Sequence, residues 1–365
     1  MRRSSQTLLA ITCSSALLYG FFLGLDLMGL GFKLLGEDFA TMLLVQTANP
    51  LVGLFVGILA TTLVQSSSTT TSMTVALVAA GGLTIEGAIP IVMGANIGTS
   101  VTNTLVSLGH ISRRVEFQRA FAGATLHDFF NWMAVLILLP LELLTGFLAK
   151  TSSFLAEVLE GAGGTKLFNP LRAIVRPAAE YIKDVMGESG ALVLAAGVIL
   201  LIVCLKFLVD LLKVLMTDRA ERILHGTVFR SGFAAVLAGL AMTVLVQSSS
   251  ITTSLMVPLV GAGIITLKQF FPYTIGANIG TTVTAMLASL STGSAASVTV
   301  AFSHLLFNVM GSLIIYLPPP VRAIPLAFAR AMGGLGSRNR LLAALYIVVF
   351  FYGLPLLLLL SAGTL

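Results

Sequence analysis

Apolar residues run in long blocks along this chain, and short polar stretches separate the blocks. A block of about 20 apolar residues is long enough to cross the hydrocarbon core of a bilayer as a helix. We expect such spans near residues 8–34, 84–108, 117–148, 190–216, 268–291, 295–317 and 340–362. The pattern therefore predicts an all-α, polytopic membrane protein with about seven full transmembrane helices.

Two further apolar blocks are too short to cross. Leu51–Val64 and Phe233–Val246 each hold 14 residues, about 21 Å of helix against a hydrocarbon core of about 30 Å. Each is followed by Gln-Ser-Ser-Ser and then by a second short apolar piece. We expect two re-entrant helical hairpins, at 50–83 and 232–265, with the polar motif at each tip. Irregular backbone at that depth must be shielded by protein or line a wet cavity.

The polar motifs are duplicated. Leu-Val-Gln-Ser-Ser-Ser at 63–68 recurs at 245–250, and Gly-Ala-Asn-Ile-Gly-Thr at 94–99 recurs at 276–281, with the same interval between the motifs in both copies. Three predicted spans separate the hairpins, and an odd number makes the hairpins enter from opposite faces. The sequence thus predicts inverted-topology repeats, an arrangement that places one binding site near the middle of the membrane.

This reading divides the chain into four segments. Repeat 1 covers 1–149 with the first hairpin, and repeat 2 covers 190–317 with the second hairpin. Between them, 150–189 is expected to be an extracellular loop with an interfacial helix. Residues 318–365 form a cytoplasmic interfacial segment and the last span.

Composition agrees with a membrane protein. The chain is 56% hydrophobic and 10% charged, whereas soluble domains carry about 25% charged residues. The net charge of +6 comes from basic loops on one side, which the positive-inside rule makes cytoplasmic. We therefore expect no nucleic-acid partner. The expected location is the cell (plasma or inner) membrane, multi-pass, with the N-terminus cytoplasmic and the C-terminus extracytoplasmic.

The serines at the hairpin tips suggest an anion site. They would open the second half-helix of each hairpin, where the first backbone N–H groups have no partner inside the helix and the helix dipole is positive. Such an end binds anions, and hydroxyls add donors. Two facing tips could surround a tetrahedral oxyanion. The serines concerned are Ser66, Ser67, Ser68, Ser248, Ser249 and Ser250.

The glycine and asparagine motifs suggest a compensating cation. An anion alone at the midplane would be costly, and sodium suits the carbonyl, amide and hydroxyl oxygens that unwound helices supply. The paired glycines of 94–99 and 276–281 are read as helix breaks, with asparagine and threonine bringing oxygens. An alternative stays open, because small and hydroxyl residues also line ordinary helix contacts in membranes.

No nucleotide-binding, metal-helix or nucleophile-elbow pattern occurs in the sequence, so we expect neither an enzyme nor a cofactor. The motifs do resemble the type II sodium–phosphate cotransporter family. The resemblance rests on Gln-Ser-Ser-Ser at 65–68, on the runs 94–104 and 119–128, and on the second copies of the paired motifs. It implies sodium-coupled uptake (symport) of inorganic phosphate by alternating access, with sodium ions as the co-substrate.

The resemblance also implies roles for individual residues. Phosphate contacts fall to the six serines, and sodium or hairpin-orienting roles fall to Gln65, Asn96, Thr99, Ser100, Gln247, Asn278, Thr281 and Thr282. Three alternatives stay open: a sodium-coupled transporter of another small anion, such as sulfate or a carboxylate; an anion channel; and a membrane scaffold without transport. The expected partners are phosphate, sodium and the lipid bilayer, and the oligomeric state is open, a homodimer included.

Overall fold

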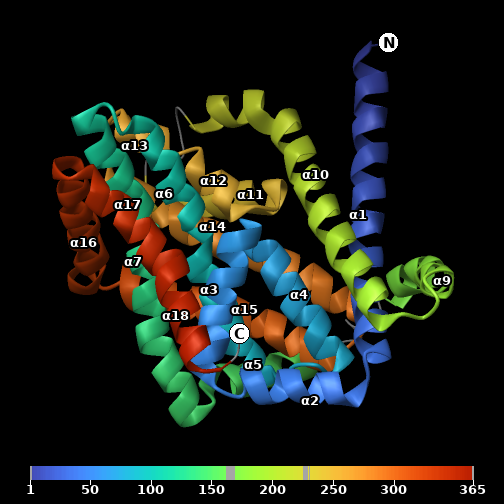
Figure 1. The fold of residues 1–365 in the computed structure, drawn as a ribbon. Coiled ribbons are helices and arrows are strands. Elements are labelled where there is room, and N and C mark those ends of the chain that lie inside the picture. Colours follow the sequence, from blue (N-terminus) through green and yellow to red (C-terminus); the bar gives the residue numbers. More distant parts are fainter. Residues whose placement is uncertain (1, 162–168, 225–228, 230, 364–365) are drawn as a thin grey trace.

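The computed structural model describes residues 2–161, 169–224, 229 and 231–363, and within these residues it contains helices and no strand (Figure 1). The expected all-α class is therefore confirmed. Five helices are long and apolar enough to cross a membrane: Thr12–Leu34, Arg114–Thr145, Gly190–Leu208, Ala295–Tyr316 and Arg340–Ser361. The expected total of about seven spans stays a prediction.

The first half of the chain forms seven α-helices and one short 3-10 helix. They are α1 (Arg2–Leu34), α2 (Gly36–Thr47), α3 (Pro50–Val64), α4 (Ser67–Ala80), α5 (Ile85–Thr99), α6 (Val101–Ser107), η1 (Leu108–His110) and α7 (Arg114–Thr145). The helix ends follow local chemistry. Pro50 opens α3 behind the Asn49 cap, and Gly81 ends α4 in the left-handed conformation that glycine adopts readily.

The middle and second half of the described chain are also helical. Their helices are α8 (Phe147–Gly161), α9 (Asn169–Val185), α10 (Gly190–Leu224), α11 (Gly232–Val246), α12 (Ser249–Ser254), α13 (Val257–Gly261), α14 (Leu267–Thr292), α15 (Ala295–Tyr316), α16 (Pro319–Arg338), α17 (Arg340–Val348), η3 (Val349–Gly353) and α18 (Leu354–Ser361). Among them, η3 is a single π-helical stretch. The expected interfacial stretch 150–189 contains most of α8 and all of α9. Part of it, 162–168, lies outside the described residues.

Two long helices, α1 and α10, lie side by side along one flank (Figure 1). Glycines set their close approach. A side chain on Gly24 would meet the backbone of Gly197 and Leu201, and a side chain on Gly31 would meet the backbone of Leu194. Small residues of this kind let helix backbones approach closely in membranes.

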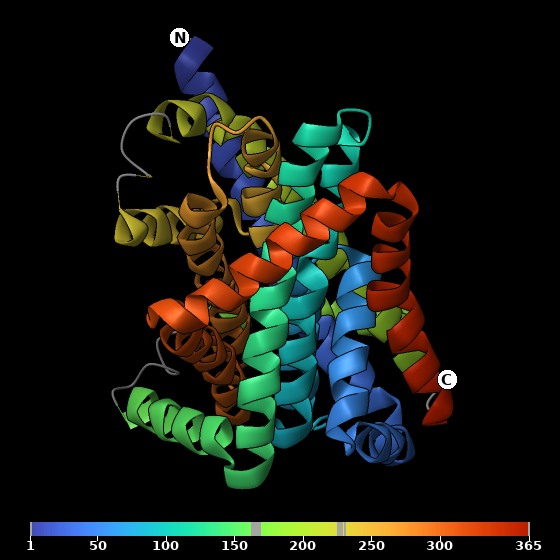
Figure 2. The same ribbon diagram turned by 90° about the vertical axis from the view of Figure 1, so that its left-hand side faces the viewer.

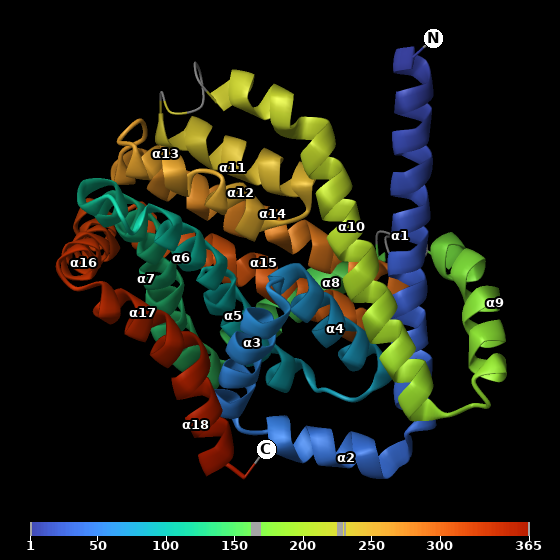
Figure 3. The same ribbon diagram turned by 45° about the horizontal axis from the view of Figure 1, so that its top comes forward.

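The repeat visible in the sequence is also visible in the packing, since α3 lies against α5 and α11 lies against α14 (Figure 3). Glycines make both contacts possible. An added Cβ on Gly94 would collide with the Leu54 carbonyl oxygen, and one on Gly276 with the Val236 carbonyl oxygen. The glycines of the duplicated motifs therefore serve close helix packing.

That packing corrects the expectation that both motifs break their helices. In repeat 1 a boundary does follow the motif, because α5 ends at Thr99 and α6 starts at Val101. In repeat 2 the expectation is wrong, since α14 runs unbroken through 276–281. The physical reason is that a glycine pressed against a neighbouring backbone is held in helical geometry by that contact.

Candidate functional site

Each Gln-Ser-Ser-Ser motif forms a sharp turn between two helices. Gln65 ends α3 and Gln247 ends α11, both in the left-handed conformation, with φ of 58° and 56°. Non-glycine residues seldom adopt this conformation, and it persists where the surroundings hold it. Here each glutamine side chain holds its own turn, because Nε2 donates to a carbonyl oxygen of the preceding helix at 2.5 Å, Thr62 in one copy and Val244 in the other.

The amide oxygens of the two glutamines are also used in the same way. Gln65 Oε1 accepts a hydrogen bond from Thr102 Oγ1 at 3.0 Å, and Gln247 Oε1 accepts one from Thr284 Oγ1 at 2.7 Å. These bonds tie each turn to the helical segment just after the glycine motif of its own repeat, which is α6 in the first copy and the rest of α14 in the second. Of the two roles expected for the glutamines, this geometry supplies the hairpin-orienting one.

The first serine of each motif caps the following helix. Ser66 Oγ accepts from the backbone N–H of Thr69 at 3.2 Å, and Ser248 Oγ accepts from that of Ile251 at 3.3 Å. A serine cap satisfies one of the unpaired N–H groups at a helix start. The remaining first-turn N–H groups have no partner inside the helix and carry the positive end of its dipole.

The two turns meet in space although about half of the chain separates them. Ser68 Oγ of the first turn donates to the backbone oxygen of Gln247 in the second at 3.3 Å. A cavity of about 600 Å³ lies beside this contact. Six residues of the two motifs line it: Gln65, Ser66, Ser68, Gln247, Ser248 and Ser250.

The other two serines of the motifs lie behind the cavity wall. Ser67 and Ser249 are buried and do not line the cavity, and Ser249 Oγ has no hydrogen-bond partner among the described residues. Their place follows from helix geometry. In a first turn, neighbouring residues point about 100° apart, so the serines cannot all face one space.

The asparagines of the glycine motifs belong to a buried network between the repeats. Asn278 Oδ1 lies 2.6 Å from His127 Nε2, and Asn278 Nδ2 donates to Asn131 Oδ1 at 2.8 Å. Asn131 Nδ2 in turn donates to the backbone oxygen of Asn96 at 2.7 Å. On the far side of the ring, His127 Nδ1 lies 3.3 Å from Asn103 Nδ2. The network places α7 between the two glycine motifs.

The remaining hydroxyls of the expected sodium set face their own helices. Thr99, Ser100 and Thr282 each donate to a backbone oxygen three or four residues earlier, at 2.9, 2.7 and 2.7 Å. Thr281 does the same at 2.8 Å. Each hydroxyl oxygen keeps acceptor lone pairs. None of these residues, nor Asn96 or Asn278, lines the cavity at the turns.

Lys206 of α10 and Thr102 of α6 also line this cavity, and the sequence pattern assigned neither of them to the site. A signal for Lys206 existed, since it is an ionisable residue inside a predicted span and such residues are functional candidates by default. Asp128 is a comparable case. Its carboxylate is fully buried beside the network and accepts a hydrogen bond from Tyr346 at 2.9 Å.

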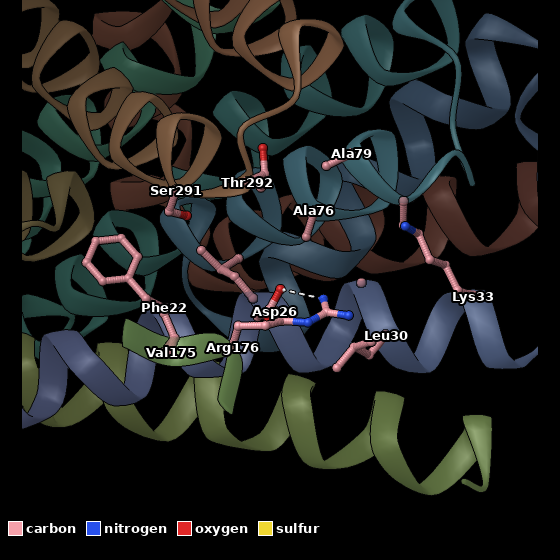
Figure 4. A pocket seen from close by; sticks show the side chains of 13 residues that line it. Phe22, Asp26, Leu30, Lys33, Ala76, Ala79, Val175, Arg176, Ser291 and Thr292 are labelled. Atoms are coloured by element: carbon pink, nitrogen blue, oxygen red, sulfur yellow. Dashed lines mark hydrogen bonds and ion pairs between the residues drawn. The ribbon is translucent and has the colours of Figure 1, made fainter. Parts of the chain in front are cut away.

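A second cavity, of only about 50 Å³, lies beyond the end of α4 between α1, α9 and the end of α14. Figure 4 shows Asp26 of α1 beside Arg176 of α9, with Ser291 and Thr292 across the cavity. Arg176 Nη1 lies 3.4 Å from Asp26 Oδ1. A volume of this size holds few waters, so this cavity is a junction between helices with an ion pair at its wall.

Comparison with known proteins places the chain in a family. The family model of the Na+/Pi-cotransporter matches residues 21–159 and 200–316, which include both serine motifs and both glycine motifs. The chain belongs to the Na+/Pi-cotransporter family. The resemblance stated from the motifs is therefore confirmed.

Several curated relatives cover nearly the whole chain. Sodium-dependent phosphate transport protein 2B of Homo sapiens is 34% identical over 93% of this chain and 63% of its own length. Protein 2A of Ovis aries is 34% identical and that of Oryctolagus cuniculus 35%, each over 97% of this chain and 68% of its own length. The chain thus spans less than two thirds of the 2B proteins it matches. No solved structure matches this cotransporter-family chain.

Proposed function

We propose that this membrane protein is a sodium-coupled symporter of inorganic phosphate. The proposal is supported by the family, by relatives named for sodium-dependent phosphate transport, and by helices of membrane length. The observation that carries it is the single cavity that serines from both duplicated turns line.

In this proposal the oxyanion binds between the two turns. The Ser68 and Ser250 hydroxyls would turn from the backbone oxygens of Gln247 and Thr99 to donate to the oxyanion. The first turns of α4 and α12 would supply backbone N–H groups. Hydrogen bonds to an ionised acceptor are the strong ones. Ser67 and Ser249 are buried and do not line the cavity, so any effect of these two side chains on the anion would be indirect.

Sodium, as the co-transported ion, would bind behind the cavity wall. The oxygens present there are the Asn96 and Asn278 side chains, the hydroxyls of Thr99, Ser100, Thr281 and Thr282, and the backbone oxygens that these hydroxyls meet. Hard cations prefer such oxygen ligands. Ser250 Oγ donates to the Thr99 backbone oxygen at 3.4 Å, which gives a cation near Thr99 a direct route to influence the anion site.

Alternating access would follow from the inverted repeats. The helix pairs α3–α4 and α11–α13 are proposed as re-entrant hairpins that enter from opposite faces and exchange exposure around the fixed site. The start of α1 and the end of α18 lie toward opposite ends of the molecule (Figures 1 and 2). This placement supports a cytoplasmic N-terminus and an extracytoplasmic C-terminus in the cell membrane.

Uptake of labelled phosphate into proteoliposomes tests the proposal. An inward sodium gradient should drive accumulation, and an equal potassium gradient should not. S68A and S250A should each lower uptake by about tenfold or more, because each removes a donor to an ionised group. S337A should leave uptake unchanged, because Ser337 is half-buried near the end of α16, bonds within its own helix and does not line the cavity. Flux that ignores the sodium gradient would contradict symport, and stronger competition by unlabelled sulfate than by unlabelled phosphate would reassign the substrate.

A further inference from the structure

The wall of the main cavity that faces the two serine turns comes from α10. Ile202, Leu205 and Lys206 of this helix line the cavity, and their spacing puts them on one helix face. Lys206 is the one charged residue among the described residues that line it, and no carboxylate is among them. The cavity therefore combines hydroxyls, two helix starts and a single ammonium group.

Lys206 lies within the apolar span Gly190–Leu208, about 24 Å along the helix from Gly190. A lysine in such a position has two ways to keep its charge. It can extend along the helix to the membrane surface, or it can turn to a polar space in the protein interior. The Lys206 side chain is exposed, and it lines the same cavity as Ser66 and Ser248, so its charge borders the polar space at the two turns.

The internal repeat gives an independent reason to look at this residue. Helix α1 precedes the first hairpin as α10 precedes the second, yet 20–26 of α1 is Gly-Phe-Phe-Leu-Gly-Leu-Asp and contains no cation. The serines and glutamines of the site are duplicated, whereas the lysine occurs once. A residue needed only for the folding of a repeat would be expected in both copies. A lysine that occurs once, beside two duplicated turns, is better explained by the binding of one anion at the shared cavity.

We propose that the Lys206 ammonium is a direct ligand of the transported oxyanion and sets its preference for a doubly charged substrate. The inference rests on the function proposed above and adds a residue outside both motifs. Hydroxyls and helix starts offer only partial charges, so they discriminate poorly between one and two negative charges. A compact ammonium adds a full charge with three rotatable donors and favours the more highly charged form of a tetrahedral oxyanion.

The test compares K206M, which keeps the length of the stem and removes the charge, with K206R, which keeps the charge. K268M is the matched control, since Lys268 is an exposed lysine that lines a different cavity. Two quantities are measured for each purified protein: the Kd of inorganic phosphate at saturating sodium, by calorimetry in detergent, and the KM for phosphate uptake in proteoliposomes. Thermal unfolding without phosphate reports whether each variant is folded.

We expect K206M to raise Kd and KM about tenfold or more, as for loss of a charge-assisted hydrogen bond, with thermal unfolding unchanged. The K206R values should fall between those of K206M and the wild type, and those of K268M should equal the wild type. The preference for alkaline over acidic buffer, which tracks doubly charged phosphate, should weaken in K206M alone. An unchanged Kd and KM in folded K206M would overturn the inference and leave the proposed symport intact.

A second variant distinguishes phosphate binding by Lys206 from a purely structural role of this residue. Asp210 stands one helical turn after Lys206 in the sequence, so a lysine needed only to neutralise that carboxylate would become dispensable once the carboxylate is removed. Full recovery of phosphate affinity in K206M combined with D210N would therefore overturn the inference, and continued loss supports it. If wild-type protein binds inorganic phosphate but shows no sodium-driven uptake, the proposed symport fails while the Kd comparison still tests Lys206.

Discussion

The two repeats use the same residues to build the same turns, but they place their buried histidines in different surroundings. His127 of α7 lies between Asn103 and Asn278, at 3.3 and 2.6 Å. His304 of α15, in the matching His-x-x-x-Asn motif, is as deeply buried, and neither of its ring nitrogens has a hydrogen-bond partner among the described residues. Duplicated sequence thus fixes the backbone framework and leaves the polar contacts between repeats free to diverge.

The largest expected effect is on folding, and it comes from substituting the glycines at the helix contacts that the two repeats share. G94V and G276V should each prevent stable folding, because the new side chain would occupy the space of the Leu54 or Val236 carbonyl oxygen and a backbone cannot move aside cheaply. The loss should exceed about 3 kcal/mol in either repeat. The yield of monodisperse protein in detergent measures it.

G29V and G334V are the controls, since nothing lies within 4 Å of a Cβ added at either position. They should yield folded protein, apart from the modest cost of a β-branched residue in a helix. If G94V abolished folding while G276V behaved like the controls, the two helix contacts would not be equivalent. The claim that both repeats share one backbone framework would then be wrong.

The next largest effect is on the free energy of unfolding when the buried histidines are replaced, and here the two repeats should differ. H127L should lower the free energy of unfolding by about 1–3 kcal/mol, because it leaves buried groups of Asn103 and Asn278 unpaired. H304L should be neutral or stabilising, since it removes two buried nitrogens that have no partner. Thermal unfolding of the two variants in the same detergent measures the difference.

Equal losses in H127L and H304L would mean that His304 stabilises the fold, either by hydrogen bonds made in another conformation or by packing. That outcome would sharpen the comparison, because an inverted-repeat transporter exchanges the arrangements of its repeats as it changes its open side. H304Q, which restores donor and acceptor groups, would then recover the stability that H304L loses. No recovery would assign the loss to packing alone.

Many helix ends of this fold could be predicted from local sequence. Pro50 and the polar turns at 65–68 and 247–250 marked helix ends that depend only on neighbouring residues. The continuity of α14 could not be predicted, because it depends on contact between Gly276 and a distant helix. A glycine that loosens an isolated helix is the same residue that lets two helices touch.

The motifs of the site could be predicted from the sequence, but which of their side chains face the cavity could not. Ser68 and Ser250 face the cavity while Ser67 and Ser249 do not, a division set by the rotation of α4 and α12 against their neighbours. The place of Lys206 depends in the same way on how α10 packs along α1. The pairing of His127 with Asn278 joins residues 151 positions apart, and no spacing rule within one segment can predict it.

The smallest expected effect compares α9 and α16, which lie in the two segments that the sequence predicts to be interfacial. Helix α16 crosses α7 (Figure 2), where Gly333 and Gly336 pack against Ala122 and Phe121, and it contains no acidic residue. Helix α9 packs through the buried residues Val175 and Ala179 and adds ion pairs to that contact. Arg176 contacts both Asp26 and Glu180, and Lys183 lies 3.0 Å from Glu180. The attachment of α9 should therefore respond to pH, whereas that of α16 should not.

The protonation of the Glu180 carboxyl sets the direction in which the attachment of α9 changes with pH. Hydrogen bonds from Lys183 and then Arg176 hold its pKa below the usual value, so its contribution is present above the unfolded-state pKa and is lost as pH falls through the folded-state pKa. The Lys183 pKa is raised by the same partner, so that contribution is lost only in strongly alkaline buffer. Both groups are partly exposed and screened by solvent, so the effect should be small. Amide-exchange protection factors, which correct for the intrinsic pH dependence of exchange, should fall in α9 and not in α16 on acidification, and E180Q should remove most of the difference. An equal fall in both helices would assign the effect to general loosening.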